Sequence, residues 1–209
     1  DMIYTSAGTI TINGGHFKSV TPKWTINCND KAYKNGTASI VVNGGTFVGI
    51  DPRNCETEGA GTSFVAEGVG VDNENGTFTA TPNMVAQIIA ADGSSVAAYD
   101  NLTDAIKAAK SGETVLLLTN IDSSVSATYS AQNLTIDLNG YTIKGGTLST
   151  AALKLSVKAV RDANYAVTIT SSKDGGAIVG QLPLQLGGSY LANEIKIAID
   201  DSVKLTVLE

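Results

Sequence analysis

Residues 9–17, Thr-Ile-Thr-Ile-Asn-Gly-Gly-His-Phe, recur without a gap at residues 39–47 as Ser-Ile-Val-Val-Asn-Gly-Gly-Thr-Phe. In each copy apolar and polar residues alternate, which is the period of a β-strand with one buried face. The Asn-Gly-Gly that follows consists of residues that adopt positive φ, so it predicts a sharp turn. A repeat with a period of thirty residues favours stacked coils over a hairpin meander, because hairpin strands are separated by only two to five residues.

The composition predicts a folded protein. Of 209 residues, 22 are glycine and 4 are proline, 43% are hydrophobic and 16% are charged. This content of apolar residues excludes intrinsic disorder, and glycines without a three-residue period exclude collagen. The length suits one long domain or two small ones.

The charge excludes two classes of partner. Fourteen basic and twenty acidic residues give a net charge of −6, and no Lys/Arg cluster occurs. We therefore expect no nucleic-acid partner and no binding to anionic membranes. The longest apolar runs, such as 115–118, are far shorter than the roughly 20 residues of a membrane span, so we expect a soluble protein without membrane insertion. Asp1 lies almost inside a strand-like run, and we expect both ends of the chain to be cuts.

A helix is predicted over residues 101–111. Its apolar residues fall at i, i+3, i+4 and i+7 and form one face: Leu102, Ala105, Ile106 and Ala109. Asn101 is a suitable N-cap, and Gly112 can end the helix.

Short strands are predicted on both sides of this helix. They are 85–91 and 95–99, joined by a tight turn, and then 114–119, 134–138, 153–157, 167–170, 183–186, 195–199 and 203–208. The spacing becomes irregular toward the end, which indicates either loops of varying length or antiparallel strands that cap the stack. The predicted domains are a repeat segment at 1–83, a hairpin linker at 84–98 and a second β segment at 99–209.

Residues 99–118, followed by 134–143, resemble the opening of a right-handed parallel β-helix of the pectate-lyase-like superfamily. In that superfamily an amphipathic helix plugs the open N-terminal end of the solenoid. The upstream copies of the repeat resemble those of large secreted or surface-anchored proteins of gut bacteria. The resemblance implies an all-β, right-handed parallel β-helix with one short capping helix. The alternative is a pair of immunoglobulin-like β-sandwiches divided near residues 84–98.

The resemblance also implies catalytic patterns, and the chain lacks them. Hydrolases of this fold carry paired aspartates with a nearby histidine and arginine, yet Asp200-Asp201 stands alone near the end of the chain. The lyases need calcium-binding acids and a basic residue, whereas Arg53 and Arg161 lie in unrelated loops. We therefore expect no catalytic residue. The sequence leaves open whether the chain belongs to an enzyme, and it favours a non-enzymatic role. Asp137 is expected to point outward as a surface or turn-bonding carboxylate.

Two other polar features favour structural roles. His16 takes the position of Thr46 in the second copy of the repeat, so we expect a surface residue beside a turn. Residues 72–75, Asp-Asn-Glu-Asn, carry oxygen ligands but lack the spacing of a calcium loop, which favours an Asx-rich turn. No metal and no cofactor are expected.

The predicted function is that of a non-catalytic, adhesin-like segment of an exported bacterial surface protein. It would bind a glycan or host ligand or act as a stalk, at the cell surface or outside the cell. One alternative is a polysaccharide lyase or glycoside hydrolase whose catalytic coils lie in other parts of a longer chain. Another is a phage fibre or capsid appendage. The oligomeric state is left open.

The candidate ligand-binding residues are two aromatic side chains in the polar segment 18–38. Trp24 and Tyr33 can stack on a sugar, but the sequence favours structural packing for Trp24, because single aromatic residues in loops commonly fill the space beneath them. The two cysteines, Cys28 and Cys55, are either two free thiols or one disulfide between the loops of neighbouring repeats. The disulfide would imply an exported protein.

Overall fold

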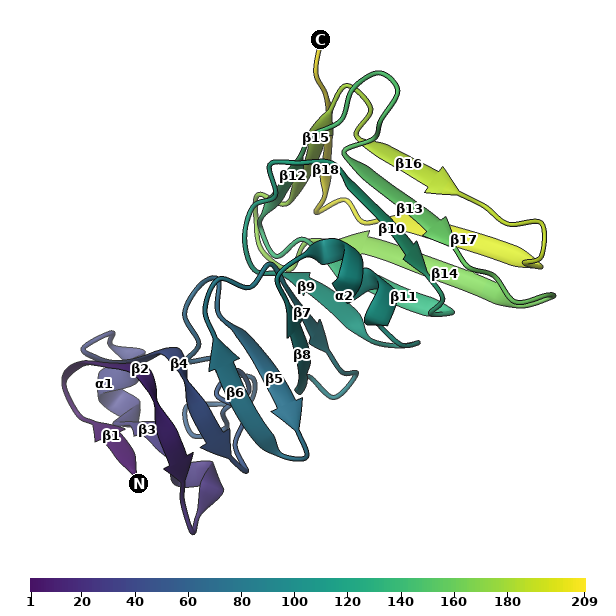
Figure 1. The fold of residues 1–209 in the computed structure, drawn as a ribbon. Helices are drawn as coiled ribbons and strands as arrows, with labels where there is room; N and C mark the ends of the chain where they lie inside the picture. Colours follow the sequence, from purple (N-terminus) through teal and green to yellow (C-terminus); the bar gives the residue numbers. More distant parts are fainter. The chain divides into compact units, whose positions relative to one another are not determined.

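A computed structural model describes residues 1–209, and it shows an all-β protein with 47% strand and 7% helix (Figure 1). The strands make a β-solenoid of about seven turns, which confirms the predicted β-helix class. The chain divides into two compact units, which are described separately. Unit 1 comprises residues 1–84 and 92–98, and unit 2 comprises residues 85–91 and 99–209. The domain bounds drawn from the sequence stay a prediction.

Unit 1 contains the repeat. Its elements are β1 (Ile3–Thr5), β2 (Gly8–Lys18), the 3-10 helix η1 (Pro22–Trp24), β3 (Ile26–Cys28), α1 (Asp30–Lys34), β4 (Ala38–Val48), β5 (Gly70–Glu74), β6 (Thr77–Thr81) and most of β8 (Ser95–Tyr99). The two copies of the repeat are β2 and β4, which lie side by side and pair in parallel (Figure 1). In the same way β1 pairs in parallel with β3. Consecutive coils therefore stack as the thirty-residue period predicts.

Apolar residues at equivalent positions of the coils form rows in the core of unit 1. Ile12 lies beside Val42, and Phe17 lies beside Phe47 with ring centroids 5.0 Å apart. Phe78 of β6 continues the aromatic row on the other side of Phe47. Each fully buried side chain of this size stabilises the fold by roughly 1.5–3 kcal/mol relative to an exposed one.

The Asn-Gly-Gly segments do not form the predicted sharp turns. Both β2 and β4 continue through them, and the ladder shifts its register at Asn13. Gly45 has a φ of +119°, a conformation that favours glycine, and the side chain of Asn43 donates a hydrogen bond to Asn13 Oδ1 at 2.9 Å. The parallel neighbour keeps both strands hydrogen-bonded, so the glycines form an irregularity within a long strand.

A hairpin of β5 and β6 follows β4 in unit 1. Its strands are connected by a turn at Asn75 and Gly76, with φ +52° and +80°, whereas residues 72–74 of the predicted Asx-rich turn belong to β5. Two consecutive left-handed residues are the signature of a tight hairpin turn. The spacing of the last predicted strands had left open an antiparallel cap at the end of the chain. The structure has an antiparallel pair here instead, between β4 and β6.

Unit 2 is a solenoid of three sheets in which nearly all neighbouring strands are parallel. Its elements are β7 (Ala86–Ile89), α2 (Leu102–Ala108), β9 (Thr114–Leu117), β10 (Val125–Tyr129), β11 (Asn133–Asp137), β12 (Thr142–Lys144), β13 (Leu153–Val157), β14 (Asn164–Thr170), β15 (Ala177–Gly180), β16 (Leu184–Gly187), β17 (Glu194–Ile199) and β18 (Lys204–Val207). Within this unit the sheets have the orders β17-β14-β11-β9-β7, β10-β13-β16 and β12-β15-β18. All of these pairs are parallel except β7 with β9.

The predicted capping helix is α2. The side chain of Asn101 accepts a hydrogen bond from the backbone N–H of Asp104 at 2.8 Å, as an N-cap does. The predicted apolar face is buried, and α2 packs against β7, β9 and β10. The helix ends at Ala108 instead of residue 111, because Ala109 turns to an extended conformation and the N–H of Lys110 bonds to the side chain of Glu113. Neither α1 nor α2 has the length and apolarity to cross a membrane.

Most strands of unit 2 lie within a few residues of their predicted positions, but β10, β12 and β15 were not predicted. They are three to five residues long and carry few large apolar side chains. Asp137 is buried at the end of β11, which corrects the outward orientation expected from alternation. Its turn-bonding role is confirmed, because its Oδ1 accepts hydrogen bonds from the N–H groups of Asn139 and Ser172, both at 2.8 Å.

Candidate functional site

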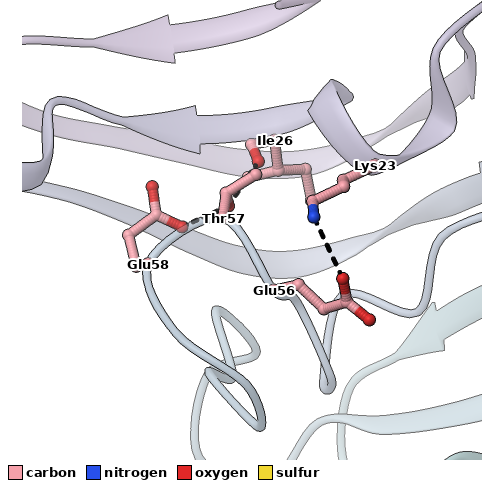
Figure 2. A network of polar contacts seen from close by, with 5 residues as sticks. All are labelled: Lys23, Ile26, Glu56, Thr57 and Glu58. Atoms are coloured by element: carbon pink, nitrogen blue, oxygen red, sulfur yellow. Dashed lines mark hydrogen bonds and ion pairs between the residues drawn. The ribbon is translucent and has the colours of Figure 1, made fainter.

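The polar loops of unit 1 meet on one surface, which is the best-defined candidate site. Segment 22–34 carries η1, β3 and α1, and segment 49–59 belongs to the loop after β4. Figure 2 shows residues of the second segment against β3. The single proton of the Thr57 hydroxyl is shared between the carbonyl of Ile26, at 3.2 Å, and the Glu58 carboxylate, and this carboxylate also accepts a hydrogen bond from the N–H of Cys28. We call Thr57 and Glu58 the loop clamp.

The loop clamp takes the place of a missing strand. In β3, alternate backbone groups face β1, and the carbonyl of Ile26 and the N–H of Cys28 face the opposite side. Unpaired backbone groups at such an edge would be costly if buried. Here two side chains satisfy them, and the carboxylate of Glu58 is fixed as a result.

Two small hollows flank the loop clamp. The first, called the Tyr33 hollow, has a volume of about 220 Å³ and is lined by Asp30, Tyr33, Lys34, Thr57, Glu58 and Gly59. The second has a volume of about 190 Å³ and is lined by Lys23, Gly49, Ile50, Asp51, Asn54 and Glu56. Both are smaller than the roughly 300–1,000 Å³ typical of pockets for small molecules. Each can therefore hold part of a larger ligand.

Tyr33 is held in place by aromatic packing. Its ring meets Phe64 edge to face, with centroids 5.9 Å apart. Burial raises the pKa of the Tyr33 hydroxyl, and the negative charge of Glu58 raises it further. The hydroxyl therefore keeps its proton at neutral pH and can donate a hydrogen bond into the hollow.

Trp24 lies apart from the Tyr33 hollow. It is the last residue of η1, it is 43% exposed, and it lines neither hollow. The Lys23 ammonium lies 5.9 Å from its ring centroid and forms an ion pair with Glu56 at 3.2 Å (Figure 2). That ion pair is exposed and contributes about 0–1 kcal/mol. The structure thus places the two predicted aromatics in separate surroundings.

Cys28 and Cys55 belong to the same buried core cluster, and the structure holds both as free thiols. Burial raises the pKa of Cys28 to about 11 and that of Cys55 to about 12, with further contributions from Glu58 and, at Cys55, from Asp51. Both remain protonated at neutral pH and behave as small apolar residues, because the thiolate is the reactive form.

The other residues singled out from the sequence are dispersed. His16 is exposed in β2 and pairs with Thr46, as expected. Asp200 caps a turn by accepting a hydrogen bond from the N–H of Ser202 at 2.9 Å. Across residues 1–209, no group of three or more His, Cys, Asp or Glu side chains is arranged to hold a metal ion.

Five residues of the Tyr33 hollow were not predicted: Asp30, Lys34, Thr57, Glu58 and Gly59. They occur in ordinary polar loop sequence, so their residue types alone give no signal. Their meeting depends on the stacking of two coils about thirty residues apart.

No family model, no curated protein and no solved structure matches this chain. The geometry itself therefore defines the class, which is that of a parallel β-solenoid.

Proposed function

We propose that this chain is a non-catalytic, glycan-binding segment of an exported bacterial surface protein. The observation that carries the proposal is the Tyr33 hollow. It combines an aromatic ring and hydroxyl with two carboxylates, an ammonium group and a threonine hydroxyl. Sugars present vicinal hydroxyls and weakly apolar C–H faces, which such a mixture of groups can bind.

Preorganisation supports a binding role. The Glu58 carboxylate is held by the Cys28 N–H and the Thr57 hydroxyl, and the Tyr33 ring is held by Phe64. The Asn29 side chain caps α1 by accepting a hydrogen bond from the N–H of Ala32 at 3.1 Å. A ligand would therefore lose little affinity to the ordering of these groups.

The surface context rests on the sequence. The repeat resembles those of secreted and surface-anchored bacterial proteins, and the opening of unit 2 resembles the pectate-lyase-like superfamily. A stack of parallel coils supplies a rigid frame that carries loops at fixed spacing. In this proposal the solenoid is the frame of an adhesin-like protein outside the cell, and the loops of unit 1 contact the glycan.

The test is a glycan array with the full chain, followed by calorimetric titration of the strongest hit. Tyr33→Phe removes one hydroxyl, and Glu58→Gln removes one charge; we expect each to weaken binding about tenfold, since one hydrogen bond to a charged or well-placed group contributes about 1.5 kcal/mol. Tyr190→Phe is the matched control, because Tyr190 is 95% exposed in unit 2. Trp24→Ala measures whether the second aromatic contributes.

Two outcomes would contradict the proposal. One is an array without any bound glycan. The other is binding that both the Tyr33 and the Glu58 variants leave unchanged, although their circular dichroism matches that of the wild-type chain.

A further inference from the structure

A third hollow lies in unit 2, at one corner of the solenoid. The corner is formed by the end of α2 and the segment after it, the turn between β10 and β11, and the segment between β13 and β14. The volume of the hollow is about 390 Å³, which is within the range typical of pockets for small molecules. We call it the lysine hollow. Its polar side chains are those of Lys107, Lys110, Ser111, Ser130, Gln132 and Tyr165.

The lysine hollow differs in charge from both hollows of unit 1. Each of those has two carboxylates in its lining, whereas the lysine hollow has none. Lys107 and Lys110 are exposed, and neither ammonium group has an ion-pair partner. The nearby acids are bonded elsewhere: Glu113 accepts from the Lys110 N–H at 2.7 Å, and Asp104 accepts from the Asn101 side chain at 2.8 Å. A chain with a net charge of −6 therefore contains one positively charged hollow at this corner.

A buried hydroxyl adds a hydrogen-bond donor to the lysine hollow. Tyr165 is 2% exposed, and its ring meets Tyr129 edge to face with centroids 6.4 Å apart. The Tyr165 oxygen accepts a hydrogen bond from the Val160 N–H at 2.8 Å, but its own proton has no acceptor within the chain. A buried donor without an acceptor is unfavourable. An acceptor that enters the hollow would satisfy this proton.

The other polar side chains of the lysine hollow can bind hydroxyl groups. The Ser111 oxygen accepts a hydrogen bond from the Asn133 N–H at 3.2 Å, so its proton remains available. Ser130 and Gln132 are exposed, and their side chains form no hydrogen bond within the chain. Hydroxyl and amide groups both donate and accept, as the ring hydroxyls of a sugar require. Val160, which is 68% exposed, adds an apolar surface for the C–H face of a sugar ring.

The backbone of this corner favours a saccharide over a peptide as the ligand. Extended peptides bind mainly through main-chain hydrogen bonds to an open strand edge. Here the main chain is already bonded between coils. The N–H of Gly112 donates to the carbonyl of Asn133 at 2.8 Å, and the N–H of Ala166 donates to the carbonyl of Gln132 at 2.6 Å. Recognition at this corner therefore depends on side chains, which supply positive charge and hydroxyl groups.

We propose that the lysine hollow binds the anionic group of an acidic saccharide, a carboxylate or a sulfate. The ammonium groups of Lys107 and Lys110 and the hydroxyl of Tyr165 would donate hydrogen bonds to that group. The serine and glutamine side chains would bind the neighbouring ring hydroxyls. This site lies wholly in unit 2, and it does not rest on the function proposed for the Tyr33 hollow in unit 1.

The experiment is a calorimetric titration of the full chain with short oligosaccharides of different charge. Hyaluronan tetrasaccharide carries carboxylates, κ-carrageenan tetrasaccharide carries sulfates, and cellotetraose is neutral. We expect at least one acidic probe to bind, and the comparison of the two identifies the anionic group. Lys107→Gln and Lys110→Gln should each weaken that binding about tenfold, and Tyr165→Phe should have an effect of similar size. Neither lysine variant should change any binding of cellotetraose.

Matched controls separate this site from general charge effects and from unit 1. Lys173→Gln removes the same charge from an exposed turn of unit 2 outside the hollow, and it should leave binding of the acidic probe unchanged. Tyr33→Phe should also leave it unchanged, so the two proposed sites can fail independently.

Three results would overturn the proposal. The first is that neither acidic probe binds. The second is that Lys173→Gln weakens binding as much as Lys107→Gln does, which would assign the effect to overall charge. The third is that a short glutamate peptide of the same charge binds as tightly as the acidic saccharide, which would assign the hollow to acidic peptides. Because Lys107 and Lys110 are exposed, their variants should keep the wild-type circular dichroism and provide the test even if Tyr165→Phe disturbs the fold.

Discussion

Gly14 and Gly44 hold the same position in the two copies of the repeat, and together they test the stacking of the coils. A Cβ added at Gly44 would lie 3.0 Å from the backbone oxygen of Asn13, whereas one added at Gly14 would meet nothing within 4 Å. Neither glycine has a positive φ, so the backbone accepts alanine at both positions. The two substitutions therefore differ only in the presence of a neighbouring coil.

The expected difference follows from two opposing effects. Alanine at a compatible position stabilises a protein by about 0.4–1 kcal/mol, because it restricts the unfolded chain. This gain is common to both variants. At Gly44 the added methyl group presses on a backbone oxygen of β2, which cannot move aside as a flexible side chain does, and such overpacking costs about 1–3 kcal/mol. We expect Gly44→Ala to be less stable than Gly14→Ala by about 1–3 kcal/mol.

The assay is urea unfolding in dilute solution, monitored by circular dichroism. The free energies of unfolding are compared only if the wild-type chain and both variants share one m value. Equal effects of the two substitutions would refute the reasoning. In that case Asn-Gly-Gly would act as the local turn that the sequence first indicates, with no dependence on the adjacent coil.

Three further predictions concern the core, the capping helix and the thiols. Ile136→Ala, at a fully buried site in β11, should cost about 2–5 kcal/mol in chemical unfolding, while Thr135→Ala beside it should change stability by less than about 0.5 kcal/mol. Asn101→Ala should lower the thermal midpoint through a loss of about 1 kcal/mol, whereas Asn101→Asp keeps the cap and should have little effect. Cys28 and Cys55 should resist a thiol reagent at pH 8 until urea unfolds the chain, and rapid labelling of the native protein would contradict their burial. Because folding raises the pKa of both thiols from 9.0 to about 11 and 12, their stabilising contribution should be complete below pH 9 and should be lost as the pH rises toward those values.

The local features of the fold were predictable because they depend on short stretches of sequence. The alternation of apolar and polar residues indicated most strands. The spacing of four apolar residues, together with Asn101 as N-cap, indicated α2. The left-handed residues Asn75 and Gly76 gave the hairpin turn in unit 1. By contrast, β12 and β15 are too short for their periodicity to be visible, and their pairing with neighbouring coils defines them as strands.

The candidate site was only partly predictable. Tyr33 could be selected because an aromatic residue in a polar loop is conspicuous. Glu58 could not, because its role depends on the N–H of Cys28, which lies thirty residues earlier in the chain and one coil away in space. Trp24 was equally conspicuous, but its position in η1 leaves it outside the Tyr33 hollow.

The sequence by itself determined that this chain forms many short strands, that residues 9–17 repeat thirty residues later, and that one amphipathic helix lies between two β segments. Residue type and periodicity suffice for that, because they act within a few residues of one another. The tertiary structure decided that Asn-Gly-Gly continues a strand, that Asp137 is buried, and that Thr57 and Glu58 complete the edge of β3. These outcomes depend on which backbone groups and apolar rows meet between successive coils, and only the stacked chain brings them into contact.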